Sequence, residues 1–385
     1  MTSYYFLLTI AVILLSTKFF GNVSEKVNMP QVVGALLAGV ILGPSVLGWV
    51  SEDDFLAKSA EIGVILLMFM AGLDTDIKEI KKNSVSLVVI ASLGVVLPLI
   101  GGAACYYFYF HVDAGDFNEV LRAVFMGVIL TATSVSITVE ALREMGKLNG
   151  KVGNAVLGAA VLDDIIGIII LTFVSSLKDT SISITEILIR IALYAIIMGV
   201  LAVILNASKP TIDELKDKRR VTIYVMALLL IISFLTERYF GIADITGAYL
   251  FGVFLSTFDV KKDIAKKMTV PGYLFFSPIF FASIGIKTEL NGMTASLLIF
   301  SALILIIAIM TKVIGCGVGA RLCGYSNRES LNIGIGMVSR GEVALIVAQK
   351  GSHMGLLSGP LFSPVVVVVI VTTMVTPILL KKFMK

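Results

Sequence analysis

The chain consists of long apolar runs separated by short polar connections. The runs are apolar throughout, without the apolar/polar alternation of a membrane-spanning strand, so the pattern predicts helices. Many of these runs are long enough to cross ~30 Å of hydrocarbon, and flanking residues can snorkel where a run is short. The predicted transmembrane helices number thirteen, at residues 4–17, 30–50, 60–73, 84–110, 121–142, 152–177, 182–205, 221–235, 242–257, 272–286, 294–320, 331–348 and 361–380.

Composition supports this pattern. The chain is 57% hydrophobic and 15% charged, with a mean hydropathy of +0.97, which soluble domains almost never reach. It is therefore predicted to be an all-α polytopic membrane protein. Its three cysteines form neither a disulfide framework nor a metal-ligand spacing, so no cofactor is expected. The first run lacks a basic lead-in and a cleavage site, which indicates a retained helix rather than a signal peptide.

Basic residues set the expected orientation. Lysine and arginine gather in alternate connections and in the C-terminal tail, whereas the other connections carry single cations such as Lys58 and Lys178. Cytoplasmic loops carry the excess of positive charge. The chain is therefore expected in the cytoplasmic membrane as a multi-pass protein, with its N-terminus outside and its C-terminus in the cytoplasm. The net charge of +4 belongs to these loops and does not indicate nucleic-acid binding.

An internal repeat is visible. Residues 34–42 match residues 247–255, and residues 72–77 match residues 285–290 at the same offset. The offset corresponds to seven spans, an odd number, so the two copies have opposite orientations in the membrane. This indicates inverted six-helix repeats, spans 1–6 and 8–13, joined by span seven. Chance similarity between Gly/Ala-rich helices is the alternative, and two matches at one offset favour the repeat.

Asp163 and Asp164 lie near the middle of the apolar run 152–177. A carboxylate at that depth costs several kcal/mol unless it is paired, solvated or protonated, so it marks an ion or proton pathway. A short membrane loop with the aspartates at its turn is the alternative. No turn residue flanks the pair, which argues against the loop.

Two spans carry polar interruptions. Five hydroxyl residues fall between Thr131 and Thr138, in the middle of span five. A continuous helix with back-bonded hydroxyls is one reading, but their density favours a broken helix whose free carbonyls could bind a cation. Residues 339–342 place a glycine and opposite charges in span twelve, the repeat partner of span five. The pattern predicts two crossed broken helices.

Buried cations need partners. Lys312 lies deep in span eleven, so it is expected to pair with Asp163 or Asp164, with snorkelling towards the cytoplasm as the alternative. Glu342 could neutralise Arg340 as a structural ion pair, or could join the ion path. Glu61 and Glu140 lie near span ends and are expected at the membrane interface.

These parts indicate antiport. Sodium and lithium prefer hard oxygen ligands, and a carboxylate poised between burial and a nearby ammonium can hold a proton or a cation, but not both. Ligand type alone does not set ion size, so K⁺/H⁺ or mixed exchange remains an alternative. Adjacent residues on a helix point ~100° apart, which argues against an intramembrane aspartyl protease and hence against an enzyme. A passive channel would not need a carboxylate–lysine switch.

The residues Thr131–Ser134, Leu162–Asp164, Lys312 and Arg340–Glu342 together resemble the monovalent cation:proton antiporter-2 family, along essentially the whole chain. The resemblance implies a homodimeric sodium/proton antiporter. Each protomer would have a scaffold at residues 1–82 and 207–290, a mobile core at 83–178 and 291–385, and a linker helix at 179–206.

The resemblance also implies residue roles. Asp164 would be the principal carboxylate for Na⁺ and H⁺, Asp163 would pair with Lys312 when the cation is absent, and Thr133 and Ser134 would line the site. Two protons per sodium, and so electrogenic exchange, are implied. Glutathione-gated potassium efflux relatives have Gln in place of the first aspartate and a nucleotide-binding domain. Here Asp163 is present and no attached nucleotide-binding domain is expected.

Overall fold

The computed structural model describes residues 4–26, 29–51, 53–75, 83–178, 184–214, 219–287, 294–357 and 359–384. All regular structure in these ranges is helical. Ten helices in the described ranges are long and apolar enough to cross a membrane, and two shorter helices are also apolar. The prediction of an all-helical polytopic membrane protein is confirmed.

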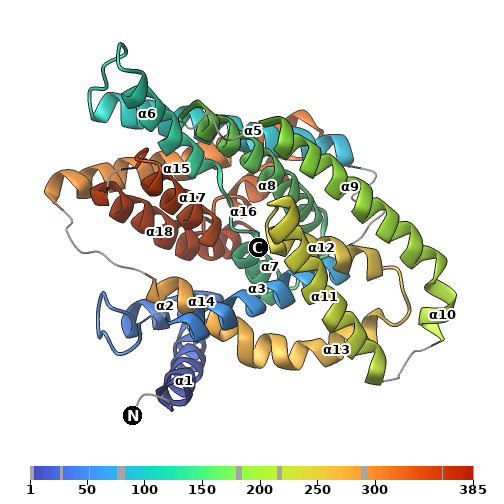
Figure 1. Ribbon diagram of the computed structural model, residues 1–385. Coiled ribbons are helices and arrows are strands. Elements are labelled where there is room, and N and C mark those ends of the chain that lie inside the picture. Colours follow the sequence, from blue (N-terminus) through green and yellow to red (C-terminus); the bar gives the residue numbers. More distant parts are fainter. Residues whose placement is uncertain are drawn as a thin grey trace.

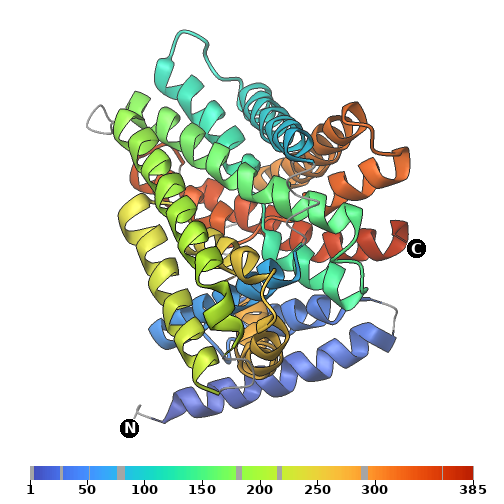
Figure 2. The same cartoon turned by 90° about the vertical axis from the view of Figure 1, so that its right-hand side faces the viewer.

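The helices form two groups, one above the other in Figure 1, with a third set along the right-hand side. The lower group contains α1 (Tyr5–Lys26), α2 (Gln31–Leu42), α3 (Asp54–Asp74), α12 (Asp244–Leu255), α13 (Lys261–Pro271), the π-helical turn η1 (Gly272–Phe276) and α14 (Ser277–Ile286). The upper group contains α5 (Ser84–Tyr109), α6 (Phe117–Thr131), α7 (Val135–Glu144), α8 (Lys151–Lys178), α15 (Ala295–Leu322), α16 (Asn327–Gly336), α17 (Glu342–His353) and α18 (Gly359–Phe383). Along the side, facing the viewer in Figure 2, run α9 (Ile184–Ala207), the short α10 (Lys209–Asp213) and α11 (Arg219–Phe240).

The predicted spans each overlap a helix or a pair of helices, and the largest difference concerns span ten. The helix there begins at Lys261 rather than at residue 272, because α13 continues through η1 into α14. Four lysines in α13 kept this stretch out of the apolar run. Of the repeat, residues 76–77 and 288–290 lie outside the described ranges.

Two helix crossings in the lower group depend on glycine. Gly39 of α2 meets Gly285 of α14, and Gly72 of α3 meets Gly252 of α12. At all four positions an added Cβ would overlap backbone atoms of the opposite helix, so the backbones approach more closely than any other residue permits. The repeat offset of 213 residues relates Gly39 to Gly252 and Gly72 to Gly285, so the repeat relates one crossing to the other.

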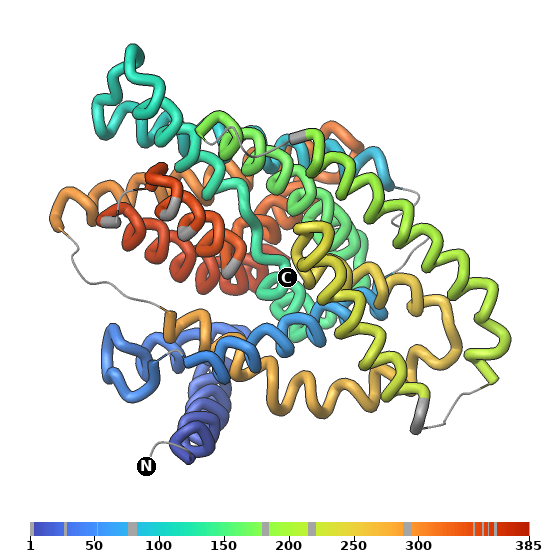
Figure 3. Tube along the Cα trace, in the orientation of Figure 1, coloured from blue at the N-terminus to red at the C-terminus, as the bar shows by residue number. Residues whose placement is uncertain are grey.

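The middle of the upper group holds two interrupted helices. The chain runs extended between α6 and α7, as the tube in Figure 3 shows, and again between α16 and α17. At the crossing, the Ser134 N–H donates to the Ser339 carbonyl at 2.7 Å, and the Ser339 hydroxyl donates to the Ser134 carbonyl at 2.7 Å. The Thr138 hydroxyl donates to the Gly336 carbonyl, also at 2.7 Å. The two unwound segments therefore satisfy each other's backbone groups, which a membrane interior requires.

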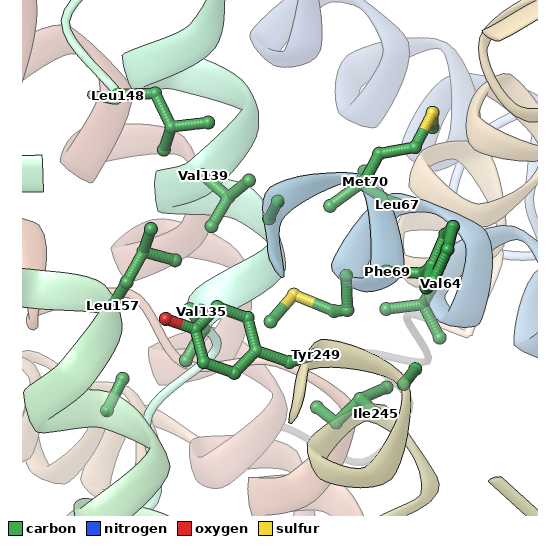
Figure 4. Packing of buried hydrophobic residues seen from close by; sticks show 14 of the residues in the cluster. Val64, Leu67, Phe69, Met70, Val135, Val139, Leu148, Leu157, Ile245 and Tyr249 are labelled. Atoms are coloured by element: carbon green, nitrogen blue, oxygen red, sulfur yellow. The ribbon is translucent and has the colours of Figure 1, made fainter. Parts of the chain in front are cut away.

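An apolar cluster joins the two groups. In Figure 4 the Tyr249 ring extends from α12 towards Val135 of α7 and Leu157 of α8, and away from Val64 and Phe69 of α3 in the same cluster. These residues are all buried. The packing in this region is non-directional, since it consists of hydrocarbon contacts rather than hydrogen bonds between the groups.

Candidate functional site

The two adjacent aspartates of α8 have different surroundings. The Asp163 side chain is 1% exposed, while Asp164 is half-buried. Successive residues of a helix point ~100° apart, so one carboxylate can face the buried crossing while the other borders an open space. The structure therefore separates two residues that look equivalent in the sequence.

Lys312 of α15 binds Asp163. Its Nζ lies 2.8 Å from Asp163 Oδ1, 2.8 Å from the Gly94 carbonyl oxygen and 2.9 Å from the Thr131 carbonyl oxygen, and its side chain is 0% exposed. An ammonium has three protons, and each has an acceptor here. A buried ion pair is tolerable only when such additional hydrogen bonds are made. Lys312 therefore does not snorkel to the surface.

Arg340 is buried completely and binds backbone carbonyls. Its Nη1 donates to Val338 at 2.8 Å, and its Nη2 donates to Leu130 at 2.8 Å and Ala308 at 3.0 Å. Leu130 lies at the end of α6 and Val338 just beyond α16, where helical carbonyls lack intrahelical donors. The guanidinium thus binds the negative ends of both interrupted helices.

The predicted partner of Arg340 is Glu342. Its backbone begins α17, and its side chain lies outside the described part of the structure, so the ion pair stays a prediction. Two hydroxyls of α18 hold the Arg340 backbone. Thr372 Oγ1 accepts its N–H at 3.2 Å, and the Thr373 hydroxyl donates to its carbonyl at 2.5 Å. The sequence signal for them is a group of threonines in the last apolar span, which was not among the predicted site residues.

Thr133 and Ser134 occupy the break in different ways. The Thr133 hydroxyl is buried beside the Asp163 carboxylate, yet it has no hydrogen-bond geometry to any described residue. Ser134 uses its N–H and carbonyl at the crossing, and its hydroxyl lies 3.2 Å from that of Ser136. Of the two predicted site hydroxyls, Thr133 is the one whose oxygen makes no hydrogen bond to a described residue.

A cavity of about 490 Å³ lies between the two groups and reaches both aspartates. The lower group lines it with residues of α3, α12 and α14, and the upper group with residues of α6, α8 and α17. Helix α11 contributes Glu237. The buried Asp163 lies at its inner end, and the exposed Glu61, Glu237 and Lys350 lie at the other. Glu61, expected at the membrane interface, is part of the cavity wall.

The opposite side is closed by contacts between the groups. The Glu144 carboxylate of α7 accepts from the backbone N–H of Gln31 at 2.6 Å and of Val32 at 3.1 Å, at the start of α2. Arg143 lies 3.4 Å from Asp74 at the end of α3. Glu140, expected at the interface, is only 12% exposed and lies 3.6 Å from Arg143. The facing helices cover this end of α7, and the depth of Glu140 at the membrane interface stays a prediction.

Interrupted helices that cross inside a membrane bundle, a buried carboxylate–ammonium pair and a cavity that reaches it from one side define the class of ion-coupled membrane transporters. The chain belongs to the sodium/hydrogen exchanger family, whose transmembrane model matches residues 9–385. It is a membrane antiporter of cations and protons, and not an enzyme.

Named relatives agree. The chain is 40% identical to the Na⁺/H⁺-K⁺ antiporter GerN of Bacillus cereus over 98% of its length and 95% of that protein. It is 35% identical to a Na⁺/H⁺ antiporter of Enterococcus hirae, over 98% and 97% of the two chains. Its fold is similar to that of the sodium proton antiporter MjNhaP1 of Methanocaldococcus jannaschii, with a TM-score of 0.74, 16% identity and coverage of 99% and 100%.

Proposed function

We propose that this chain exchanges Na⁺ or Li⁺ for H⁺ across the cytoplasmic membrane by alternating access. The observation that carries the proposal is the cavity that ends at Asp163 and Asp164, where Lys312 already neutralises one of the two carboxylates. A proton and a cation would compete for the other. Opening that site to each side in turn couples the two fluxes without a separate proton pathway.

Asp164 is the proposed exchange carboxylate, because it is half-buried at the cavity wall and so within reach of water and ions. Asp163 is its proposed partner, bound to Lys312 while the cation is absent. The buried Thr133 hydroxyl beside Asp163 is a suitable additional oxygen ligand for Na⁺. When cation binding releases Asp163, the buried Lys312 ammonium would lose its partner and give up one proton, in addition to the proton that leaves Asp164. Two protons would then exchange for one sodium, which makes transport electrogenic.

The proposed architecture has thirteen spans, with broken spans five and twelve and inverted repeats. The two glycine crossings support the repeat, since each joins one helix of the first copy to one of the second, and the repeat offset of 213 residues pairs Gly39 with Gly252 and Gly72 with Gly285. Residues 1–82 and 207–290 form the proposed scaffold, 83–178 and 291–385 the mobile core, and 179–206 the linker. The N-terminus lies outside, the C-terminus lies in the cytoplasm, and two protomers associate through their scaffolds.

Potassium is the second candidate cation. The Bacillus cereus relative, which is 40% identical, is a Na⁺/H⁺-K⁺ antiporter. Carboxylate, hydroxyl and carbonyl oxygens bind both ions, so the residues at the site do not separate them. K⁺/H⁺ or mixed exchange would use the same carboxylates.

The central experiment measures proton movement in proteoliposomes with a pH-sensitive dye, adding Na⁺, Li⁺ and K⁺ in turn. We expect Na⁺ and Li⁺ to dequench the dye, and an imposed membrane potential to change the rate because net charge moves. A response to K⁺ alone would identify K⁺, rather than Na⁺ or Li⁺, as the transported cation. A rate independent of potential would contradict the two-proton stoichiometry.

Asp164→Asn tests the exchange carboxylate. An amide can neither take up a proton nor neutralise a cation at the end of the cavity, so we expect exchange to fall to the level of empty liposomes. Asp113→Asn is the matched control, because Asp113 lies exposed and only binds the backbone of its own connection. Substantial exchange by Asp164→Asn would refute the assignment.

A further inference from the structure

Pro98 lies inside α5, between residues that are otherwise regularly helical. In an α-helix the N–H of residue 98 would donate to the carbonyl of Gly94, four positions earlier. Proline has no N–H, so this carbonyl cannot be part of the usual ladder. In the structure the Gly94 oxygen accepts a hydrogen bond from Lys312 Nζ at 2.8 Å.

We propose that Pro98 is a positioning residue for the antiport site: it frees the backbone oxygen that holds Lys312 on Asp163. This inference rests on the proposed function, in which the Asp163–Lys312 pair forms whenever the cation is absent. It assigns the strength of that pair to a proline on a third helix, α5, which acts through the Gly94 carbonyl.

The count of donors and acceptors explains why this oxygen matters. Lys312 is 0% exposed, so no water is available to its three protons. Asp163 and Thr131 accept two of them, and Gly94 accepts the third. An ammonium proton left without an acceptor in such surroundings is costly, so the charged pair depends on the Gly94 oxygen.

Gly94 itself fits this role. A Cβ added there would overlap the Cys316 sulfur and would lie 3.8 Å from both Lys312 Nζ and Asp163 Oδ1. The absence of a side chain therefore leaves α15 close enough to α5 for the ammonium to reach the backbone oxygen. Gly94 thus lets the ammonium approach, and Pro98, four residues later, leaves the Gly94 oxygen without an intrahelical hydrogen bond.

Pro98→Ala restores an N–H that competes with Lys312 for the Gly94 oxygen. The hydrogen bond to the ammonium is then weakened, which destabilises the cation-free pair relative to the cation-bound state. We expect the KM for Na⁺ to fall about fivefold, as befits one weakened charged hydrogen bond. The pH of half-maximal exchange shifts to lower values by about 0.7 unit, the same factor expressed as proton concentration.

Pro377→Ala is the matched control. Pro377 is also an interior proline of the upper group, in α18, and the carbonyl four residues before it belongs to Thr373. Within the described residues no charged side chain donates to that carbonyl. We expect this variant to keep the KM and pH profile of the parent protein, so a general effect of straightening a helix is separated from the specific one.

A double-mutant cycle with Lys312→Ala decides the mechanism. Lys312→Ala alone is expected to change the pH profile, and Pro98→Ala is expected to change nothing further in that background. An equal effect of Pro98→Ala with and without Lys312 would overturn the inference, because the proline would then act through helix shape. Pro98→Ala without effect would also overturn it, while an altered Lys312→Ala profile would leave the proposed function standing. No effect of Lys312→Ala would instead remove the proposed switch.

Folding is checked in parallel by thermal unfolding in detergent with increasing Na⁺, which reports cation binding without transport. Pro98→Ser restores the same N–H and serves as the second variant if Pro98→Ala is not produced. If neither folds while Pro377→Ala does, Pro98 has a structural role only and the inference fails.

Discussion

Buried charge at the crossing is accommodated by two cations with different chemistry. Lys312 is a compact charge with three protons, and it is satisfied by one carboxylate and two carbonyls. Arg340 has a wider planar fork, and it reaches three carbonyls on three separate segments. The first cation can release its carboxylate, and it can then give up a proton. Among the described residues the guanidinium of the second donates to backbone carbonyls, so it is suited to holding the helix ends in place.

This difference predicts the behaviour of Arg340 variants. Arg340→Ala leaves buried carbonyls without donors, at ~1–3 kcal/mol for each group, so we expect a clear loss of thermal stability. Arg340→Lys keeps the charge but cannot span the three acceptors, so its stability should fall between that of the parent protein and that of Arg340→Ala. Thermal unfolding of purified protein in detergent measures both.

Arg122→Ala is the control for Arg340. Arg122 pairs with Glu119 within one helix at a partly exposed position, where such a pair contributes about 0–1 kcal/mol. Equal melting temperatures for Arg340→Ala and Arg122→Ala would contradict the proposed role of Arg340 at the crossing.

At the level of helices, the two groups contact each other in two different ways. Around Tyr249 they share apolar packing, which can shift without breaking hydrogen bonds (Figure 4). At the closed side, the Glu144 carboxylate binds the first N–H groups of α2, where a helix offers unsatisfied donors and positive potential. Movement of one group against the other must break this directional contact first.

Glu144→Ala should therefore favour the state that is open on the Glu144 side. We expect a cysteine at the cavity wall, introduced as Leu171→Cys with Cys105, Cys316 and Cys323 replaced by serine, to react with a maleimide at least about threefold more slowly when Glu144 is absent. Glu329→Ala is the matched control. Glu329 binds Lys151 and Ser326 inside the upper group only, so its loss should leave the labelling rate unchanged. Equal rates with and without Glu144 would show that the contact does not hold this state.

Considered as a whole, the molecule has its cavity on one side and, on the other, the closing contacts together with the lysine-bearing connection between α7 and α8. Helix α3 runs from Asp54, near Glu61 at the cavity, to Asp74, which binds Arg143 at the closed side. The connection between α7 and α8, with Lys147 and Lys151, belongs to the closed side as well. If the basic side is cytoplasmic, the cavity faces outwards.

Labelling from defined sides tests this orientation. In the cysteine-free background, Leu171→Cys should react with a membrane-impermeant maleimide in right-side-out vesicles. Asn149→Cys, exposed in the connection between α7 and α8, should react only in everted vesicles. The reverse pattern would invert the topology, and labelling of both cysteines from one side would contradict a cavity opposite to the basic face.

Much of this molecule follows from local sequence. Hydrophobic runs of membrane length and the side preference of lysine and arginine depend on composition within short windows, and such windows predicted an all-helical polytopic protein. The glycines of the two repeat segments were also visible, since an invariant spacing survives in the chain itself. Aspartates in the middle of an apolar run marked the site for the same local reason: charge in hydrocarbon is costly wherever the fold places it.

The contacts that give each charge its role could not be predicted from local sequence patterns. The sequence left Lys312 with a choice of two adjacent aspartates, and helix rotation and the approach of α5 and α15 placed it on Asp163. The carbonyls that bind Arg340 come from residues 130, 308 and 338, which only folding brings together. Backbone oxygens are the same in every residue and carry no sequence signal. Their availability depends on where helices break or a proline interrupts the ladder, and on which cation then lies within 3 Å.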